Sequence, residues 1–324
     1  VFSRRWRLEF AARYADTITS MLNSVPGGEY QYGTQPVTTE EARLSVGLLL
    51  GATQSLETGI SRASSAFQTS ATSAVFTDYG LQDIFLRYVL DSGPQNQFYM
   101  QLYRQDVIQG EESLLQPDRY QINSVGVGFR RDTGRDLTSE LRVAYTVTRF
   151  TEGLWTPFEG FTLEGDFNLA PSPRTALHLK LRRAPLISFF NVSAYYLNEG
   201  GTLEINRALG RALGIRLIAD ANWNTYSDPI LVTLPAPGGD LDQNPQNGLI
   251  DAYENLLPSE GDVREDRVVT TSLALLWHVS RAMDFVTAYQ HQEFDSNVIA
   301  TGTDGKNYHP YGYESHRFLV SVSV

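Results

Sequence analysis

Apolar and polar residues alternate almost without interruption in three consecutive segments, 137–147, 161–169 and 175–181. In the second segment, the alternating residues are Phe161, Thr162, Leu163, Glu164, Asp166, Phe167, Asn168 and Leu169. A period of two residues predicts a β-strand with one apolar face and one polar face. The polar face of these strands carries charged residues as well as hydroxyl groups.

Two architectures accommodate such strands. A soluble β-sandwich buries the apolar faces between its two sheets and exposes the charged faces to water. A membrane β-barrel turns the apolar faces toward lipid and the charged faces into a wet lumen. A single strand does not distinguish these architectures, so the organisation of the whole chain has to do so.

Strand-like alternation recurs through the chain, and helical periodicity is nearly absent. The predicted strands are roughly 3–18, 41–53, 56–67, 77–90, 96–107, 118–131, 136–150, 159–170, 174–184, 192–208, 211–226, 267–279, 282–296 and 314–324. These are about fourteen strands of about 10–15 residues, and a strand needs about 9–11 residues to cross a bilayer. We interpret residues 1–324 as a single domain.

The connections between these strands alternate in length. Short ones, such as 91–94 and 132–134, carry the Gly, Pro, Asp and Ser residues that tight turns require. The longer ones are about 19–40, 68–76, 108–117, 151–158, 185–191, 227–266 and 297–313. Short turns at one rim and long loops at the other are typical of outer-membrane barrels. The pattern therefore predicts an all-β, transmembrane, antiparallel up-and-down β-barrel, with both termini at the periplasmic, short-turn rim.

Composition supports this prediction by excluding other classes. The net charge is −11, with 26 basic and 37 acidic residues, whereas a nucleic-acid binder shows a basic patch. The chain has no cysteine, which rules out a disulfide framework and a thiolate metal site. The mean hydropathy is −0.25, and no stretch of about 20 apolar residues is present to form a membrane helix. A barrel has such a mild average because only alternate residues face lipid.

Aromatic residues fall on the apolar faces, many of them near strand ends. They include Trp6, Tyr14, Tyr88, Phe129, Tyr145, Trp223, Trp277 and Phe318. Trp and Tyr favour the headgroup level of a membrane, which predicts an aromatic belt. The alternative is that strands favour aromatic residues in any setting.

The last sixty residues resemble the C-terminal end of the β-barrel porin-2 family of outer-membrane proteins. The resemblance lies in Glu293-Phe294-Asp295-Ser296-Asn297 at a strand end and in the alternating final segment 308–324. It implies an outer-membrane barrel associated with exopolysaccharide export, with envelope export machinery as a partner. The chain departs from the usual outer-membrane pattern at its last residue, Val324, where an aromatic residue is common. Because the chain begins at Val1 without Met, we expect that a signal peptide has been removed or that the chain is a piece of a longer protein.

The charged faces supply the candidate solute-contacting residues. These are Arg7, Arg13, Arg87, Arg142, Glu164, Asp166, Lys180, Arg182 and Arg216. A turn centred near Ser172 would place Glu164 opposite Lys180, Asp166 opposite His178 and Thr162 opposite Arg182. Such a mixed-charge lumen could orient polar solutes, although cross-strand charge pairs that only hold the register explain the same pattern.

The longest loop, 227–266, contains nine acidic residues and a single Arg. Oxygen-bearing residues recur within 240–254 at spacings that resemble those of calcium loops, although the two halves are out of frame with an intact EF-hand. We hypothesise that the loop binds Ca²⁺ through Asp240, Asp242, Asn244, Asn247, Asp251 and Glu254. The alternative is a solvated acidic loop that turns on its Asn, Gly and Pro residues.

No catalytic motif is evident, and none of the five histidines has a zinc-like or triad-like spacing, so we do not expect an enzyme. The most consistent function is an outer-membrane channel for a small polar solute or a polysaccharide. A general diffusion porin and a barrel that sheathes a partner, such as a cytochrome or a fibre, remain as alternatives. A soluble β-sandwich is a further alternative, and it would not need detergent.

Overall fold

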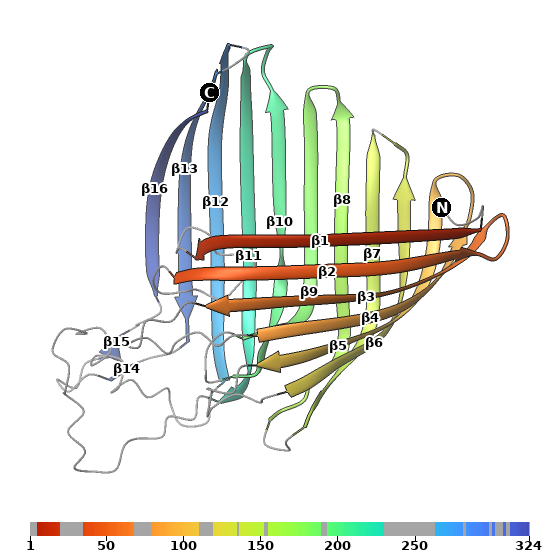
Figure 1. Cartoon of the computed structure of the whole chain (residues 1–324). Coiled ribbons are helices and arrows are strands. Elements are labelled where there is room, and N and C mark those ends of the chain that lie inside the picture. Colours follow the sequence, from red (N-terminus) through yellow and green to blue (C-terminus); the bar gives the residue numbers. More distant parts are fainter. Residues whose placement is uncertain are drawn as a thin grey trace, which may run out of the picture.

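A computed structural model describes most of the chain (Figure 1). The described residues are 5–19, 35–67, 79–109, 119–134, 136–151, 155–188, 193–229, 263–280, 283–297, 300–301, 307–308 and 312–323. This part of the chain consists of strands and connections, and it contains no helix that is long and apolar enough to cross a membrane.

Fourteen strands form one sheet, in the order β1 to β13 followed by β16. Their bounds are β1 Trp6–Thr19, β2 Gln35–Leu49, β3 Gln54–Phe67, β4 Tyr79–Asp91, β5 Asn96–Gln109, β6 Arg119–Asp132, β7 Leu137–Phe150, β8 Glu159–Ser172, β9 Thr175–Ile187, β10 Tyr195–Ala208, β11 Leu213–Pro229, β12 Val263–Ser280, β13 Met283–Ser296 and β16 Tyr313–Ser323. Two short strands, β14 Ala300–Thr301 and β15 Asn307–Tyr308, form a separate pair.

β1 to β12 each pair antiparallel with the next strand in the sequence, and β13 pairs antiparallel with β16, past the short strands β14 and β15. This is the all-β, antiparallel up-and-down topology that the alternation predicts, and the strand count agrees. The largest differences are the early starts of β2 at Gln35 and β12 at Val263 and the unpredicted pair of β14 and β15. β1 and β16 form the two edges of the sheet, so the ladder that would close a barrel is not formed between them within the described residues.

Connection lengths separate the two rims as predicted. The turns after β4 and β6 are short, and they contain Gly93 and Gly134 with φ of 106° and 81°, a backbone region that favours glycine. The Gly134 N–H also donates to Asp132 Oδ1 at 2.7 Å. β1 begins and β16 ends at this short-turn rim, because Trp6 lies opposite Leu48 and Ser323 opposite Asp284.

The sheet is strongly coiled, and β1 to β5 cross the direction of β8 to β13 in Figure 1. Contacts that skip strands identify the concave face. Tyr99 on β5 donates to Glu140 on β7 across β6, with Oη and Oε1 2.8 Å apart. Tyr120 on β6 donates to the Ala194 carbonyl, just before β10, at 3.2 Å. Tyr99, Glu140 and Tyr120 lie on the polar face, so the charged residues line the inside of the curve.

The opposite, convex face is apolar and exposed. Exposed fractions reach 72% for Phe10, 66% for Phe161 and 82% for Phe318. Other large exposed residues on this face are Trp6, Leu8, Tyr14, Leu44, Met100, Leu102, Val125, Val127, Leu217, Trp223, Leu273, Leu275, Trp277 and Val320. In a β-sandwich, a second sheet would cover this face, but all described strands except two strands of two residues belong to one sheet. The structure therefore contradicts the sandwich alternative.

The apolar band has the height of a membrane. On β1 it runs from Trp6 to Tyr14, which is eight residue steps or about 27 Å along the strand at about 3.4 Å per residue. A strand tilt of about 40° reduces this length to about 21 Å, close to the apolar band of about 25 Å on outer-membrane barrels. Aromatic residues lie toward both edges of the band, with Trp6 and Trp277 near the short-turn rim and Tyr145 and Trp223 nearer the long loops.

Candidate solute-binding site on the concave face

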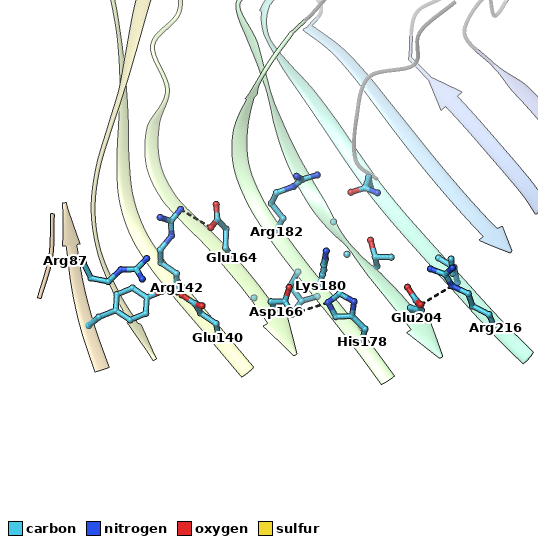
Figure 2. A pocket seen from close by; sticks show the side chains of 18 residues that line it. Arg87, Glu140, Arg142, Glu164, Asp166, His178, Lys180, Arg182, Glu204 and Arg216 are labelled. Atoms are coloured by element: carbon cyan, nitrogen blue, oxygen red, sulfur yellow. Dashed lines mark hydrogen bonds and ion pairs between the residues drawn. The ribbon is translucent and has the colours of Figure 1, made fainter. Parts of the chain in front are cut away.

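A cavity of about 650 Å³ lies on the concave face between β4 and β11. Figure 2 shows its charged side chains, which project from neighbouring strands toward the same space. They are Arg87, Glu140, Arg142, Glu164, Asp166, His178, Lys180, Arg182, Glu204 and Arg216. The strict alternation of each strand places these side chains together, because every second residue points to the concave face.

Most of the predicted solute-contacting residues line this cavity, namely Arg87, Arg142, Glu164, Asp166, Lys180, Arg182 and Arg216. Arg7 lies in an adjacent, smaller pocket that includes Arg87. Arg13 is on the same face as Arg7, opposite Glu41 in the register, but it lines neither pocket.

The predicted register of the β8–β9 hairpin is wrong by two residues. Asp166 lies opposite Lys180, Glu164 opposite Arg182, and Asn168 opposite His178. The turn is formed one residue later than predicted, since Ser172 pairs with Thr175, and an irregularity between Leu169 and Ser172 changes the register again. A shift of two residues leaves every side chain on its predicted face, so the composition of the wall was correct although its pairs were not.

Most of the acidic groups are neutralised by a basic partner on the same wall. Arg142 Nη2 lies 2.9 Å from Glu164 Oε2 on the next strand, and Arg216 Nε lies 2.9 Å from Glu204 Oε1. Figure 2 marks both pairs. Because these side chains are partly exposed, each pair contributes about 0–1 kcal/mol to stability. Their main effect is to cancel charge locally.

Asp166 and His178 form a third contact, in which Oδ1 and Nε2 are 3.1 Å apart. Sequence reasoning placed these two residues directly opposite each other, but they meet diagonally across the hairpin instead. Asp166 Oδ1 also accepts a hydrogen bond from Asn168 Nδ2 at 2.8 Å. The carboxylate is therefore engaged on its own strand and on β9, and it forms no ion pair with the facing Lys180 among the described contacts.

A chain of contacts fixes the β4 side of the cavity. Arg87 donates to Gln101 Oε1 at 2.7 Å, and its guanidinium carbon lies 4.5 Å from the centre of the Tyr99 ring. Tyr99 donates to Glu140 Oε1, and Arg130 Nη2 lies 2.7 Å from the other Glu140 oxygen. Sequence reasoning missed the linking role of Tyr99, because Tyr99 and Glu140 lie on strands that are separated by β6.

Basic side chains outnumber carboxylates around the cavity. The lining contains five basic side chains, those of Arg87, Arg142, Lys180, Arg182 and Arg216. It contains four carboxylates, those of Glu140, Glu164, Asp166 and Glu204. Lys180 on β9 is exposed and makes no polar contact with the part of the chain that the structure describes. Its neighbour on the same face, Arg182, donates from Nε to the uncharged Asn198 Oδ1 at 2.8 Å, and both side chains extend into the cavity (Figure 2). Lys180 therefore adds a positive charge to the wall at β9 that no described ion pair offsets, whereas Arg182 also interacts with the Asp220 carboxylate on β11.

Asn198, which holds Arg182, is fully buried together with two further amides. Its Nδ2 donates to Asn224 Oδ1 at 2.7 Å and to Asn222 Oδ1 at 3.2 Å, and all three side chains are at most 3% exposed. Alternation places all three asparagines on the polar face of β10 and β11. It does not predict that they are buried.

Apolar side chains pack into a cluster on the concave face at the long-loop rim. Val107 and Tyr120 are completely buried there, together with Ile122, and Phe150 and Ile187 pack against them. Alternation predicts lumen positions for Val107, Tyr120, Ile122 and Phe150, and polar residues are the norm in a lumen. The apolar character of these lumen positions could have indicated a packed cluster, but it was not used as a signal in the sequence.

The hypothetical Ca²⁺ loop is outside the described residues. This applies to Asp240, Asp242, Asn244, Asn247, Asp251 and Glu254. The ligand set therefore stays a prediction.

No family model matches the chain, and no curated protein matches it, so membership of the β-barrel porin-2 family also stays a prediction. Solved structures with a similar course of strands include the outer-membrane channel DcaP of Acinetobacter baumannii, with 11% identity, coverage of 99% of this chain and 98% of that chain, and a TM-score of 0.44.

Two receptors are also similar. The alcaligin outer-membrane receptor FauA of Bordetella pertussis has 10% identity, coverage of 98% and 54%, and a TM-score of 0.43. The ferric-catecholate import receptor Fiu of E. coli has 10% identity, coverage of 99% and 59%, and a TM-score of 0.45. The chain thus spans little more than half the length of these receptors.

Proposed function

We propose that this protein is an outer-membrane β-barrel channel that conducts polar solutes along its mixed-charge concave face. The observation that carries the proposal is the inverted distribution of polarity. The convex face exposes large apolar residues from β1 to β16, and the concave face holds the charged cavity. Soluble monomers rarely expose apolar patches larger than a few hundred Å², whereas a membrane barrel needs such a surface.

Connection lengths support the outer membrane in particular. Short turns at the rim with both termini and long connections at the other rim are typical of bacterial outer-membrane barrels, in which the long loops face outward. On this basis, we propose that the short-turn rim faces the periplasm. We also propose that outer-membrane lipid surrounds the convex face. An unpaired strand edge is costly in a lipid bilayer, so we expect β1 to pair with β16 in the membrane. This closure would convert the concave face into a lumen.

Charge on the wall defines the solute class. Arg142 and Arg216 are neutralised by acidic neighbours, whereas Lys180 forms no ion pair among the described contacts and basic side chains outnumber carboxylates in the lining. A solute with carboxylate or sulfate groups would find its counter-charge at β9. An acidic oligosaccharide or polysaccharide fits this pattern, and it agrees with the export role that the resemblance implies. A neutral solute would gain nothing from the excess of positive charge.

Swelling of protein-loaded liposomes tests the proposal. We expect liposomes with the protein to admit glucose and to admit glucuronate faster, since the two sugars are similar in size and differ in charge. Empty liposomes provide the control. Equal rates for both sugars would contradict the proposal that the channel prefers acidic solutes, but they would not contradict the proposal that the protein is a channel. Exclusion of both sugars would contradict the channel and would favour a barrel that sheathes a partner.

We also propose that the acidic segment 240–254 binds Ca²⁺, on the basis of its oxygen-rich spacing. Calorimetry with calcium chloride on the full-length protein in detergent tests this proposal. Extracellular sites bind Ca²⁺ with dissociation constants up to about 10⁻³ M, so the titration has to reach the millimolar range. Absence of heat of binding in that range would overturn the proposal.

A further inference from the structure

Three side chains with metal-binding groups meet on the convex face of β13 and β16. His291 on β13 lies directly opposite His316 on β16 in the register. Glu314 lies on the same face of β16, two residues before His316. His291 lies 25 positions before His316 in the sequence and on a different strand. For this reason, the spacing of the histidines in the sequence gave no zinc-like pattern.

The distances suit a small cation. Glu314 Oε1 lies 3.7 Å from His291 Nδ1 and 3.3 Å from His316 Nε2, and the three candidate ligand atoms lie within 4.8 Å of one another. Ligand atoms about 2.1 Å from Zn²⁺ at tetrahedral angles are about 3.4 Å apart. Small side-chain movements would therefore bring all three atoms to bonding distance.

His291 contributes a second, independent observation. Its Nδ1 atom is buried and has no hydrogen-bond partner, although the ring as a whole is partly exposed. A buried polar nitrogen without a partner is costly. Because this atom faces the Glu314 carboxylate and the His316 ring, a bound cation would satisfy it.

Tyr289 orients the second imidazole. Its hydroxyl oxygen lies 2.7 Å from His316 Nδ1, and the two rings are stacked with an interplanar angle of 19°. In the tautomer that donates from Nδ1 to the Tyr289 hydroxyl, Nε2 keeps its lone pair for a metal ion. A hydrogen bond from the other ring nitrogen is the usual support of a metal-ligating histidine.

We propose that His291, Glu314 and His316 bind one divalent transition-metal ion, with Zn²⁺ as the best fit. Two imidazoles and one carboxylate are a ligand set that Zn²⁺ uses, and water would complete a tetrahedral site. Hard cations such as Ca²⁺ and Mg²⁺ prefer oxygen ligands only, so the two imidazoles select against them.

The position of the site indicates its role. On β13 and β16, the apolar convex face ends with the row of Tyr289 and Phe318, and the next row toward the long loops contains His291 and His316. The site therefore lies just outside the apolar band. β16 is an edge strand that pairs with β13 alone among the described strands. A metal ion bound by both strands would clamp this edge in register.

Metal titration of the untagged, full-length protein in detergent tests the proposal, since a histidine tag would bind the same ions. We expect one equivalent of Zn²⁺ in competition with a chromophoric chelator, and visible absorption bands of tetrahedral Co²⁺ when Co²⁺ replaces it. Each of H291Q, H316Q and E314Q should weaken Zn²⁺ binding at least about tenfold, and Y289F, which removes only the supporting hydroxyl, by about tenfold.

His278 provides the matched control. It lies on the concave face of β12 near the short-turn rim, with Nδ1 2.6 Å from Asp284 Oδ1, and H278Q should bind Zn²⁺ as the wild type does. No saturable binding by the wild type would overturn the proposal. Equal binding by the wild type and by folded H291Q or H316Q would also overturn it. The Co²⁺ spectrum of the wild type decides the ligand geometry even if a variant does not fold.

Discussion

At the residue scale, the concave wall combines cancelled and uncancelled charges. Arg142 and Arg216 meet carboxylates within 3 Å, while Lys180 has no such partner in the described part of the chain. Arg182 donates to an amide and also interacts with the Asp220 carboxylate. Electrostatic selectivity thus depends on few side chains, although the cavity contains many charges.

Neutralising Lys180 and Arg182 should reduce anion preference. A unit charge 4 Å from an ion contributes about 1 kcal/mol in water, so we expect K180Q/R182Q to lower the anion-to-cation permeability ratio about fivefold or more. Reversal potentials in a salt gradient measure this ratio. R183Q is the control, because Arg183 is adjacent in sequence and belongs to the convex face, where it pairs with Glu199. An unchanged permeability ratio in K180Q/R182Q would show that these two β9 residues do not determine the selectivity.

Asn198 should matter for stability. It is fully buried and bonds to Arg182, Asn222 and Asn224, and its truncation leaves these groups with fewer hydrogen bonds at a cost of about 1–3 kcal/mol. Urea unfolding of N198A in lipid vesicles measures this cost. N168A is the control, because the Asn168 side chain is exposed and donates to the partly exposed Asp166. Equal stability of the two variants would show that the amide cluster is not a stabilising element.

At the scale of the strand, the sequence was most informative. A two-residue period predicts both the strand and the face of each residue, so the members of the charged wall follow from alternation alone. The pairs do not follow, because the β8–β9 register depends on the turn at Pro173 and Arg174 and on the irregularity before it. Contacts across a skipped strand, such as Tyr99 with Glu140, depend on curvature, which alternation does not specify.

Adjacent residues on one strand test which face meets lipid. Leu217 is exposed on the convex face of β11, and Ile218 points into the cavity, opposite Glu204. We expect L217R to destabilise the membrane-inserted protein by about 2–4 kcal/mol and I218R by less than about 1 kcal/mol, because the new guanidinium would face an acidic neighbour. Folding yield and urea unfolding in vesicles measure both effects. The opposite order would mean that the apolar face is buried in protein rather than in lipid.

At the scale of the whole molecule, the strand count, the antiparallel order and the two different rims could be predicted from the sequence. Closure could not, because no local pattern specifies which strand lies beside an edge. The convergence of His291 with His316 was hidden for the same reason, since it depends on the pairing of β13 with β16 across a long connection.

Disulfide cross-linking tests closure, and the absence of native cysteine makes it unambiguous. A11C on β1 can be combined in turn with S315C, R317C, L319C and S321C on β16, all on the concave face. A disulfide requires Cα atoms about 4.4–6.8 Å apart, so we expect one pair, or two neighbouring pairs, to cross-link in membranes. A12C/A42C is the positive control, because these residues already lie opposite each other. If only the control cross-links, another strand or a partner separates the two edges.

The central claim is that the charged concave face becomes an open lumen across a membrane. Single-channel recording of the purified full-length protein in a planar lipid bilayer tests it most directly. We expect steady, discrete conductance steps with a preference for anions. Repeated insertion of folded protein without any conductance would contradict it and would show that the barrel is plugged or houses a partner.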